Sequence, residues 1–260
     1  MYEFKLDVIC LWLQEVRRLQ YGCIQRDGYL FYFSGHNLLK REGVGLLFNE
    51  RFFDEIKLVK NVSSRIMWVA GIVNEISIVI FSVYAPTNVY PIAAKQKFYE
   101  ELEGELKNVP NEFRSRVFIG GDFNARIGAF DKGIFDECRG KFIGGIQNEN
   151  GLLLLEFCLR NGLYVSNSGF QKKKYGTWKH PRSKVAVTLD FWLINIGCRA
   201  LMKNCKVNYV ADVLTDHNMV EIDLFANEKK KVSGNYKVVK NKKLDYNVLR
   251  NDLDMVCYIR

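Results

Sequence analysis

Five short segments carry carboxylate, amide, phenol or imidazole groups at points where apolar runs of the sequence begin or end. They are Leu13-Gln14-Glu15, Tyr84-Ala85-Pro86-Thr87, Gly121-Asp122-Phe123-Asn124-Ala125, Leu189-Asp190-Phe191 and Thr215-Asp216-His217. Polar groups at strand ends of layered α/β folds converge on a shared crevice. Each segment alone also fits an ordinary turn. Taken together, the five segments predict a single active site.

The carboxylates of this set suit the hydrolysis of a phosphodiester. Mg²⁺ prefers one or two carboxylates together with water and substrate phosphate, and Glu15, Asp122 and Asp216 could supply such oxygens. His217 is the histidine placed to act as a general base or charge stabiliser near neutral pH. His36 and His180 are expected in loops, at the surface or on the substrate side. The expected cofactor is Mg²⁺, with Mn²⁺ as a substitute.

The alternation of side chains along an extended segment predicts the partner of His217. Asp216 is its neighbour and points to the other side, so the orienting carboxylate should come from another strand, and Asp190 is the predicted partner. Asn124 follows Asp122 by two residues and shares its face. Its amide is expected to donate to a phosphoryl oxygen as negative charge develops. The alternative for Asn124 is an Asx-type turn that satisfies its own backbone.

Strand-like and helix-like segments alternate along the chain, which predicts an α/β fold. The runs rich in β-branched and apolar residues are Leu6–Leu13, Val44–Phe48, Ile76–Tyr84, Val117–Ile119, Leu163–Val165, Leu189–Ile194 and Met219–Phe225. Helical spacing of apolar residues predicts helices over Ala93–Asn108 and Gly151–Asn161. Strands such as Ile76–Tyr84 are apolar almost throughout, so both of their faces should be covered by other layers.

Composition is that of a folded protein: 48% of the 260 residues are hydrophobic and 26% are charged. The seven cysteines include no Cys-x-x-Cys pair, which favours a reduced intracellular compartment. No run of about 18 apolar residues occurs, so no membrane-spanning segment is expected.

The net charge of +9 suggests a polyanionic partner, and its distribution is uneven. Residues 226–260 hold nine Lys and Arg against four Asp and Glu. We expect a folded domain over residues 1–225, then a basic linker and the start of a further helix, LDYNVLRNDLDMVCYI, over residues 226–260. Lys229, Lys230 and Lys231 are candidate DNA contacts, although a lysine run also fits a solvated linker. Trp178 is a loop residue that could stack on a base or pack locally.

Eight segments, in this order, resemble the endonuclease/exonuclease/phosphatase superfamily, whose fold is that of DNase I and the apurinic/apyrimidinic endonucleases. More closely, they are similar to craniofacial development protein 2-like proteins and to endonuclease domains of non-LTR retrotransposons. The segments are LQEVRRLQYG, GVGLLFNERF, VYAPT, FIGGDFNARIG, NENGLLLLEFCLRNGLYVSNSGF, YGTWKHPR, LDFWLIN and TDHNMV. The resemblance covers roughly residues 5–225 and implies a four-layered α/β sandwich of two packed β-sheets flanked by helices.

The resemblance also implies roles for the site residues. Glu15 would bind the metal and Asp216 would have a metal-side role. Tyr84 would contact the scissile phosphate, while Asp122 and Asn124 would act on the leaving group and the transition state. Asp190 and His217 would act as a pair on the attacking water. The implied activity is Mg²⁺-dependent nicking of DNA by a monomer, with a reverse transcriptase following it in the intact gene.

The sequence departs from the family at its start. Family members carry a strand with a Trp-Asn motif before the Leu-Gln-Glu strand, whereas Met1 lies 14 residues before Glu15. We therefore expect an open position in the sheet and impaired catalysis. A catalytically inactive nucleic-acid-binding module and a phosphatase of small phosphorylated substrates are the alternative functions. The lysine clusters also resemble a two-part nuclear import signal, so the expected compartment is the nucleus.

Overall fold

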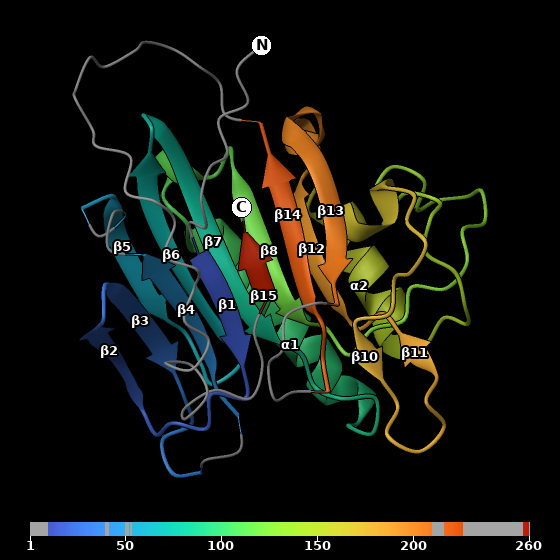
Figure 1. Ribbon diagram of the computed structural model, residues 1–260, viewed down its shortest axis with the longest axis horizontal. Helices are drawn as coiled ribbons and strands as arrows, with labels where there is room; N and C mark the ends of the chain where they lie inside the picture. The colour runs from blue at the N-terminus through green and yellow to red at the C-terminus, as the bar shows by residue number, and fades with distance from the viewer. Residues whose placement is uncertain are drawn as a thin grey trace.

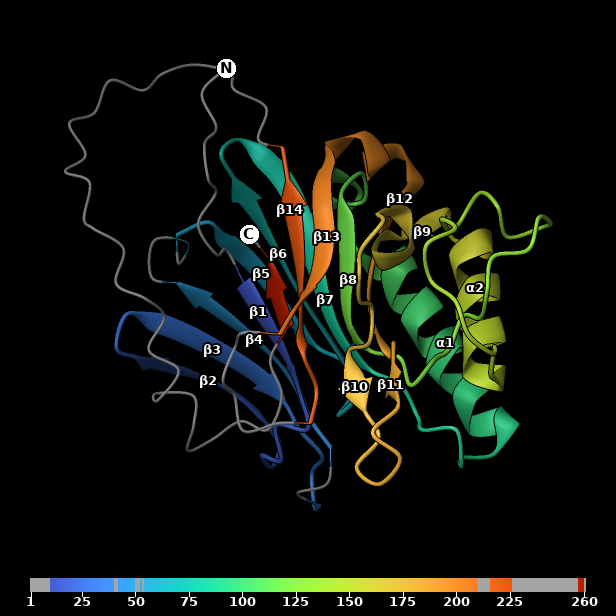
Figure 2. The same ribbon diagram turned by 45° about the vertical axis from the view of Figure 1, so that its right-hand side comes forward.

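Two β-sheets packed face to face form the body of the protein (Figures 1 and 2). The computed structural model describes residues 10–39, 42–49, 52, 54–209, 216–225 and 257–259. The predicted α/β class, with two packed sheets, is confirmed. Lys229, Lys230 and Lys231 lie outside the described residues.

The first sheet has seven strands in the order β13-β14-β15-β1-β4-β3-β2. Their bounds are β13 Met202–Asn208, β14 Met219–Leu224, β15 Cys257–Ile259, β1 Cys10–Gln14, β4 Val44–Asn49, β3 Tyr29–Ser34 and β2 Tyr21–Arg26. The described parts of the predicted strands near the two ends of the chain are β1 and β14, and β15 lies between them in this sheet (Figure 1).

The second sheet has six strands in the order β5-β6-β7-β8-β12-β9. Their bounds are β5 Ile56–Asn61, β6 Ile66–Val73, β7 Ile76–Tyr84, β8 Val117–Asp122, β12 Asp190–Asn195 and β9 Leu163–Val165. A separate two-stranded hairpin is formed by β10 (Trp178–Lys179) and β11 (Ala186–Val187). β7 and β8 are parallel, and β12 runs antiparallel to β8.

The helices α1 (Ile92–Asn108) and α2 (Glu149–Arg160) lie on the side of the second sheet that faces away from the first sheet (Figure 2). These are the two predicted helices. Short 3-10 helices occur at Asn111–Phe113, Ser166–Gly169 and Ile196–Leu201. The described residues therefore form three layers, and they contribute no α-helix to the outer face of the first sheet. None of the described helices has the length and apolar character needed to cross a membrane.

The central strands of the second sheet are buried on both faces, which explains their apolar sequences. Along β6, Ile66, Trp68 and Ala70 belong to the core beneath the helices, while Met67 and Val69 belong to the core between the sheets. Successive residues of a strand point to opposite faces, so both sets must be apolar. The prediction that such strands are covered on both sides is confirmed.

The end of the chain differs from the sequence prediction. Tyr258 of β15 pairs with Leu11 of β1 in antiparallel register and with Glu221 of β14 in parallel register. The prediction of a further helix through the end of the chain is therefore wrong for Cys257–Ile259, which form a strand instead. The predicted open position in the sheet is not found beside β1, which pairs with β15 on one side and with β4 on the other. The remainder of the tail lies outside the described residues.

Candidate active site

Three neighbouring strands of the second sheet place Tyr84, Asp122 and Asp190 side by side. Asp122 is in register with Tyr84 on one side and with Asp190 on the other. Phe118 and Trp192 belong to the core between the sheets, and alternation along β8 and β12 gives Asp122 and Asp190 the same orientation. The predicted convergence of strand ends therefore occurs at one edge of this sheet, on the face toward the other sheet.

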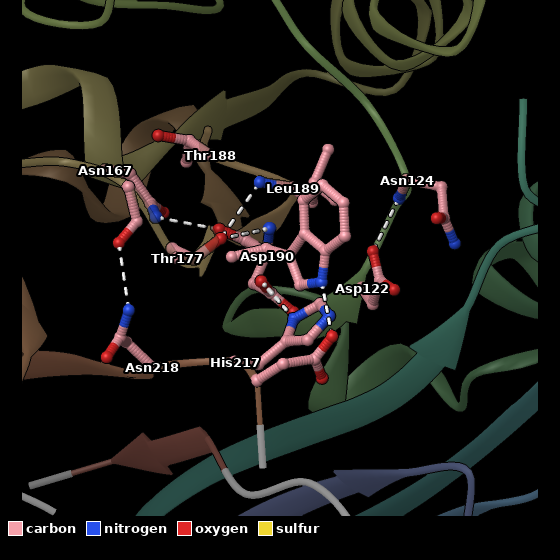
Figure 3. A network of polar contacts seen from close by, with 12 residues as sticks. Asp122, Asn124, Asn167, Thr177, Thr188, Leu189, Asp190, His217 and Asn218 are labelled. Atoms are coloured by element: carbon pink, nitrogen blue, oxygen red, sulfur yellow. Dashed lines mark hydrogen bonds and ion pairs between the residues drawn. The ribbon is translucent and has the colours of Figure 1, made fainter. Parts of the chain in front are cut away.

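His217 and Asp190 form a buried hydrogen-bonded pair. His217 Nδ1 lies 2.9 Å from Asp190 Oδ2, and the two side chains are 8% and 0% exposed (Figure 3). Asp190 is also fixed through its backbone, because its N–H donates to Thr177 Oγ1 and its carbonyl accepts from Asn167 Nδ2. The partner that strand geometry predicted for His217 is the one that the structure brings to it.

Asp216 points elsewhere, as expected for the neighbour of His217. Its Oδ2 accepts a hydrogen bond of 2.6 Å from Trp178 Nε1. Trp178 belongs to β10 rather than to a loop, so its predicted placement is wrong, and its backbone forms a bridge with His217. The Trp178 ring centre lies 6.3 Å from that of His217 and 5.5 Å from that of His180. Trp178 and His180 both line the cleft described below.

Asn124 joins the two loops that follow β7 and β8. Its backbone N–H donates to Asp122 Oδ1 at 2.7 Å, which is an Asx turn, and its Nδ2 donates to Ala85 O at 3.0 Å. Its φ of 49° lies in the left-handed region that asparagine tolerates better than most residues. A side-chain amide carries two hydrogens, so one remains for a ligand. The Asx turn is made by the side chain of Asp122, and the Asn124 amide contacts Ala85 rather than its own backbone, so the alternative use predicted for Asn124 is wrong. Its contact with a phosphoryl oxygen stays a prediction.

Glu15 connects the two sheets at the same edge. Tyr84 donates its phenolic hydrogen to Glu15 Oε1 at 2.9 Å, and Arg17 Nη2 lies 2.9 Å from Glu15 Oε2. Burial, followed by the nearby Glu15 and Asp122 carboxylates, raises the pKa of Tyr84 far above its ordinary value. The phenol therefore stays protonated and acts as a hydrogen-bond donor.

The buried groups have strongly shifted pKa values. Burial and then the adjacent Asp190 carboxylate raise the pKa of Asp122 to about 8. Burial lowers the pKa of His217, but the charge and hydrogen bond of Asp190 outweigh it and raise that pKa to about 9. Near neutral pH, His217 is therefore protonated and Asp122 retains a proton for much of the time. Such shifts are typical of functional sites.

The same cluster fits a metal ion. Asp122, Asp190 and His217 offer ligand atoms that all lie within 4.8 Å of one another. Asp190 Oδ1 is buried and has no hydrogen-bond partner among the described residues. An orphaned carboxylate oxygen beside a second carboxylate favours a bound cation. The predicted ligands Glu15 and Asp216 do not belong to this cluster, although both line the same cleft.

The cleft has a volume of about 990 Å³. Seven predicted site residues line it: Glu15, Tyr84, Asp122, Asn124, Trp178, Asp216 and His217. Asp190 lies behind His217. Sequence reasoning missed Arg17, Arg126 and Asn148, which also line the cleft. Arg126 could have been predicted, because it follows Asn124 by two residues, as Asn124 follows Asp122, and alternate residues of an extended segment share a face.

Comparison with known proteins identifies the fold. No protein-family model matches the chain. The endonuclease domain of TRAS1, a telomere-specific non-LTR retrotransposon, is 17% identical with a TM-score of 0.56 and covers 80% of this chain and 87% of its own. AP endonuclease LMAP from Leishmania major is 13% identical with a TM-score of 0.59 and covers 82% of this chain and 76% of its own. The fold is therefore that of the endonuclease/exonuclease/phosphatase superfamily, as the sequence predicted.

The sequence is homologous to craniofacial development protein 2. The Bos taurus protein is 28% identical over 218 residues, which are 83% of this chain. The chain spans 36% of the length of that relative. The predicted resemblance is confirmed.

Proposed function

We propose that this chain is a divalent-metal-dependent phosphodiesterase that nicks DNA. The observation that carries the proposal is the buried hydrogen bond between Asp190 and His217 beside Asp122, in a cleft that also holds Glu15 and Tyr84. Two proton-carrying groups with opposite tasks thus lie next to each other. This arrangement is what hydrolysis of a phosphate ester requires.

His217 and Asp122 are assigned the two proton transfers. As water attacks phosphorus, the neutral form of His217, which is the minor form near pH 7, takes its proton at Nε2, while Asp190 holds Nδ1 and stabilises the imidazolium that forms. Asp122 has a raised pKa and donates its proton to the leaving oxygen as the phosphorus–oxygen bond breaks. One proton is taken and one is given, so the pair returns to its starting charge once these protons exchange with water.

Asn124 and Tyr84 are assigned to the developing negative charge on the phosphoryl oxygens. Asn124 retains one amide hydrogen that Ala85 does not use. Tyr84 is protonated and donates its single phenolic hydrogen to Glu15, so it can donate to a phosphoryl oxygen only after that hydrogen turns from Glu15 to the phosphate. Donors fixed before the reaction stabilise such charge without reorganisation.

Glu15 and Asp216 are the proposed protein ligands of the cation, with Mg²⁺ as its identity and Mn²⁺ as a substitute. When bound, such a cation polarises the phosphoryl oxygens and neutralises part of the negative charge of the cleft. The cluster of Asp122, Asp190 and His217 is the competing position for the ion. The carboxylates of the cleft fit an oxygen-preferring cation in either case.

DNA is the proposed substrate, because nucleases are among the structures with this fold and because the chain carries a net charge of +9. We assign the activity to the nucleus on the lysine clusters of residues 229–243. A reverse transcriptase as a neighbour in the same polypeptide remains part of the proposal.

The test is conversion of supercoiled plasmid to open circles by the purified chain with Mg²⁺. We expect nicking that EDTA stops and that Glu15→Ala abolishes, with His36→Ala unchanged as the control. His36 is a suitable control because its Nδ1 accepts from the backbone of Leu38 and it does not line the cleft. Release of phosphate from small monoesters without nicking would identify a phosphatase. Metal-independent DNA binding without cleavage of either substrate would identify an inactive binding module.

A further inference from the structure

The segment Asn148-Glu149-Asn150-Gly151, at the start of α2, forms a set of contacts that the proposed reaction does not use. Asn148 caps the helix by accepting from Gly151 N at 2.8 Å, as such asparagines often do. The same Oδ1 also accepts from the backbone N–H of Arg126 at 2.8 Å, and Nδ2 donates to Asn124 O at 3.1 Å. The first turn of α2 is therefore tied to the loop that carries Asn124.

Asn150 ties the same turn to two loops at once. Its side chain is buried, with the residue 1% exposed, and Nδ2 donates to Pro86 O at 2.9 Å and to Asn124 O at 3.1 Å. Pro86 O belongs to the loop after β7, whose last residue is Tyr84. Asn124 O belongs to the loop after β8, whose last residue is Asp122. The amide has two hydrogens, and each is used once.

Glu149 and Gly151, the neighbours of Asn150 in the chain, also hold the start of α2 against the loops of the cleft. Glu149 pairs with the buried Lys95 at 2.5 Å, and Lys95 also donates to the carbonyl of Asn88 beside the cleft. A Cβ on Gly151 would lie 1.9 Å from the carbonyl oxygen of Arg126, so only glycine permits this approach. The close packing of α2 against the loop therefore leaves Asn124 little freedom to move.

We propose that Asn150 is a positioning residue for the proposed phosphodiesterase, on which this inference rests. By joining Pro86 O to Asn124 O, it holds Asn124 in its left-handed conformation. That conformation directs the Asn124 N–H to Asp122 Oδ1 and its side-chain amide to Ala85 and the cleft. Without the link, Asn124 Nδ2 still joins the two loops through Ala85 O, but Pro86 O and Asn124 O each lose a donor, so Asn124 and Asp122 are held less firmly toward the reacting phosphate.

The test compares Asn150→Ala with Asn161→Ala. Asn161 lies at the other end of α2, and its Nδ2 also donates to a carbonyl, that of Phe157. Both variants remove an asparagine amide from an end of the same helix, but Asn150 is buried and Asn161 is half-buried, so Tm is measured for each variant and kcat is compared only between folded proteins. We expect Asn150→Ala to lower kcat for nicking by about 10²-fold with KM for DNA nearly unchanged, because small displacements of reacting groups cost about that much. Asn161→Ala should retain kcat.

A double substitution checks that Asn150 acts through Asn124. In the Asn124→Ala background, Asn150→Ala should reduce kcat by less than about threefold, since the group it positions is gone. Equal losses of kcat in Asn150→Ala and Asn161→Ala, or full additivity with Asn124→Ala, would overturn the assignment. Should Asn150→Ala fail to fold, Asn150→Ser retains a single hydrogen-bond donor and is used in its place. It should likewise lower kcat in the wild-type background and much less in the Asn124→Ala background.

Hydrogen exchange separates failure of this inference from failure of the proposed function. If the wild-type chain nicks no DNA, the proposed function fails, but the link between the loops is still measurable without substrate or metal. Asn150→Ala should then lose amide protection in residues 85–87 and 123–126 together, and Asn161→Ala should keep it. Unchanged protection in Asn150→Ala would refute the positioning role.

Discussion

Asp122 and Asp190 face each other as a register pair across antiparallel strands, with Asp122 the last residue of β8 and Asp190 the first of β12. Two buried carboxylates in contact cannot both stay ionised without a counter-charge. His217 supplies one through its bond to Asp190, and a proton on Asp122 relieves the remaining repulsion. The chemistry of the cleft therefore follows from a single pairing of two strands.

The first prediction concerns Asp190 and His217 as a unit. Asp190→Asn, His217→Ala and the double variant should each lower kcat/KM for nicking by roughly the same factor, about 10²- to 10⁴-fold, because both residues serve one proton transfer. The loss of activity in each variant is measured from plasmid nicking under single-turnover conditions. Losses that multiply in the double variant would show that the two residues act separately.

The second prediction concerns the dependence of stability on pH. The folded-state pKa of His217 is raised from 6.5 to about 9 and that of Asp122 from 3.8 to about 8. A pKa raised by folding gives stability that is present below the unfolded value and is lost as pH rises through the folded value. Without divalent metal, Tm should therefore fall between about pH 4 and pH 8 through Asp122 and between about pH 6.5 and pH 9 through His217. Asp122→Asn should flatten that fall, and an unchanged slope would contradict the assignment.

The third prediction locates the metal ion. If Glu15 anchors it, Glu15→Gln should weaken Mn²⁺ binding measured by calorimetry by at least about tenfold and abolish nicking, since the ion loses a carboxylate ligand. Asp190→Asn should then lower nicking while retaining Mn²⁺. The reverse result, with binding lost only in Asp190→Asn, would place the ion in the cluster of Asp122, Asp190 and His217.

Much of this site could be predicted from local sequence, because each group is at a strand end and strand ends converge. Alternation along an extended segment was enough to choose Asp190 rather than Asp216 as the partner of His217. The Trp178–Asp216 and Tyr84–Glu15 hydrogen bonds could not be predicted, since they join residues 38 and 69 positions apart. Their formation depends on how the hairpin and the two sheets pack.

The missed elements have similar causes. No residue of β2 or β5 is buried, so their sequences lack the apolar runs that marked the predicted strands. β3 and β6 do carry such runs, and the sequence prediction missed them nevertheless. β15 pairs through its backbone with Leu11 and Glu221, and helical spacing upstream of it masked a short strand. Backbone pairing with distant strands leaves no local pattern in a three-residue segment.

The fourth prediction concerns the tail lysines. Replacing Lys229, Lys230 and Lys231 by serine should weaken DNA binding and reduce the slope of log affinity against log salt by up to about 2.7, because each neutralised phosphate contributes about 0.9. Substitution is preferable to deletion of the tail, since deletion would also remove β15. The nicking rate at saturating DNA should not change. An identical salt slope would show that these lysines are only a solvated linker.

The last prediction concerns Arg126, an exposed residue that lines the cleft and lies two positions beyond Asn124. Asn148 fixes its backbone, because the Arg126 N–H donates to Asn148 Oδ1 and the Arg126 carbonyl accepts from the Asn148 N–H. Its guanidinium has no hydrogen bond or ion pair to the rest of the described chain. A guanidinium on a fixed backbone beside the site is suited to a phosphate next to the scissile one. Arg126→Ala should therefore raise KM for DNA several-fold, leave kcat nearly unchanged and reduce the salt slope by about 0.9.

Arg26, exposed on β2 and paired with Asp27, is the matched control, and Arg26→Ala should leave all three quantities unchanged. A fall in kcat without a change in KM would assign Arg126 to the reacting phosphate instead.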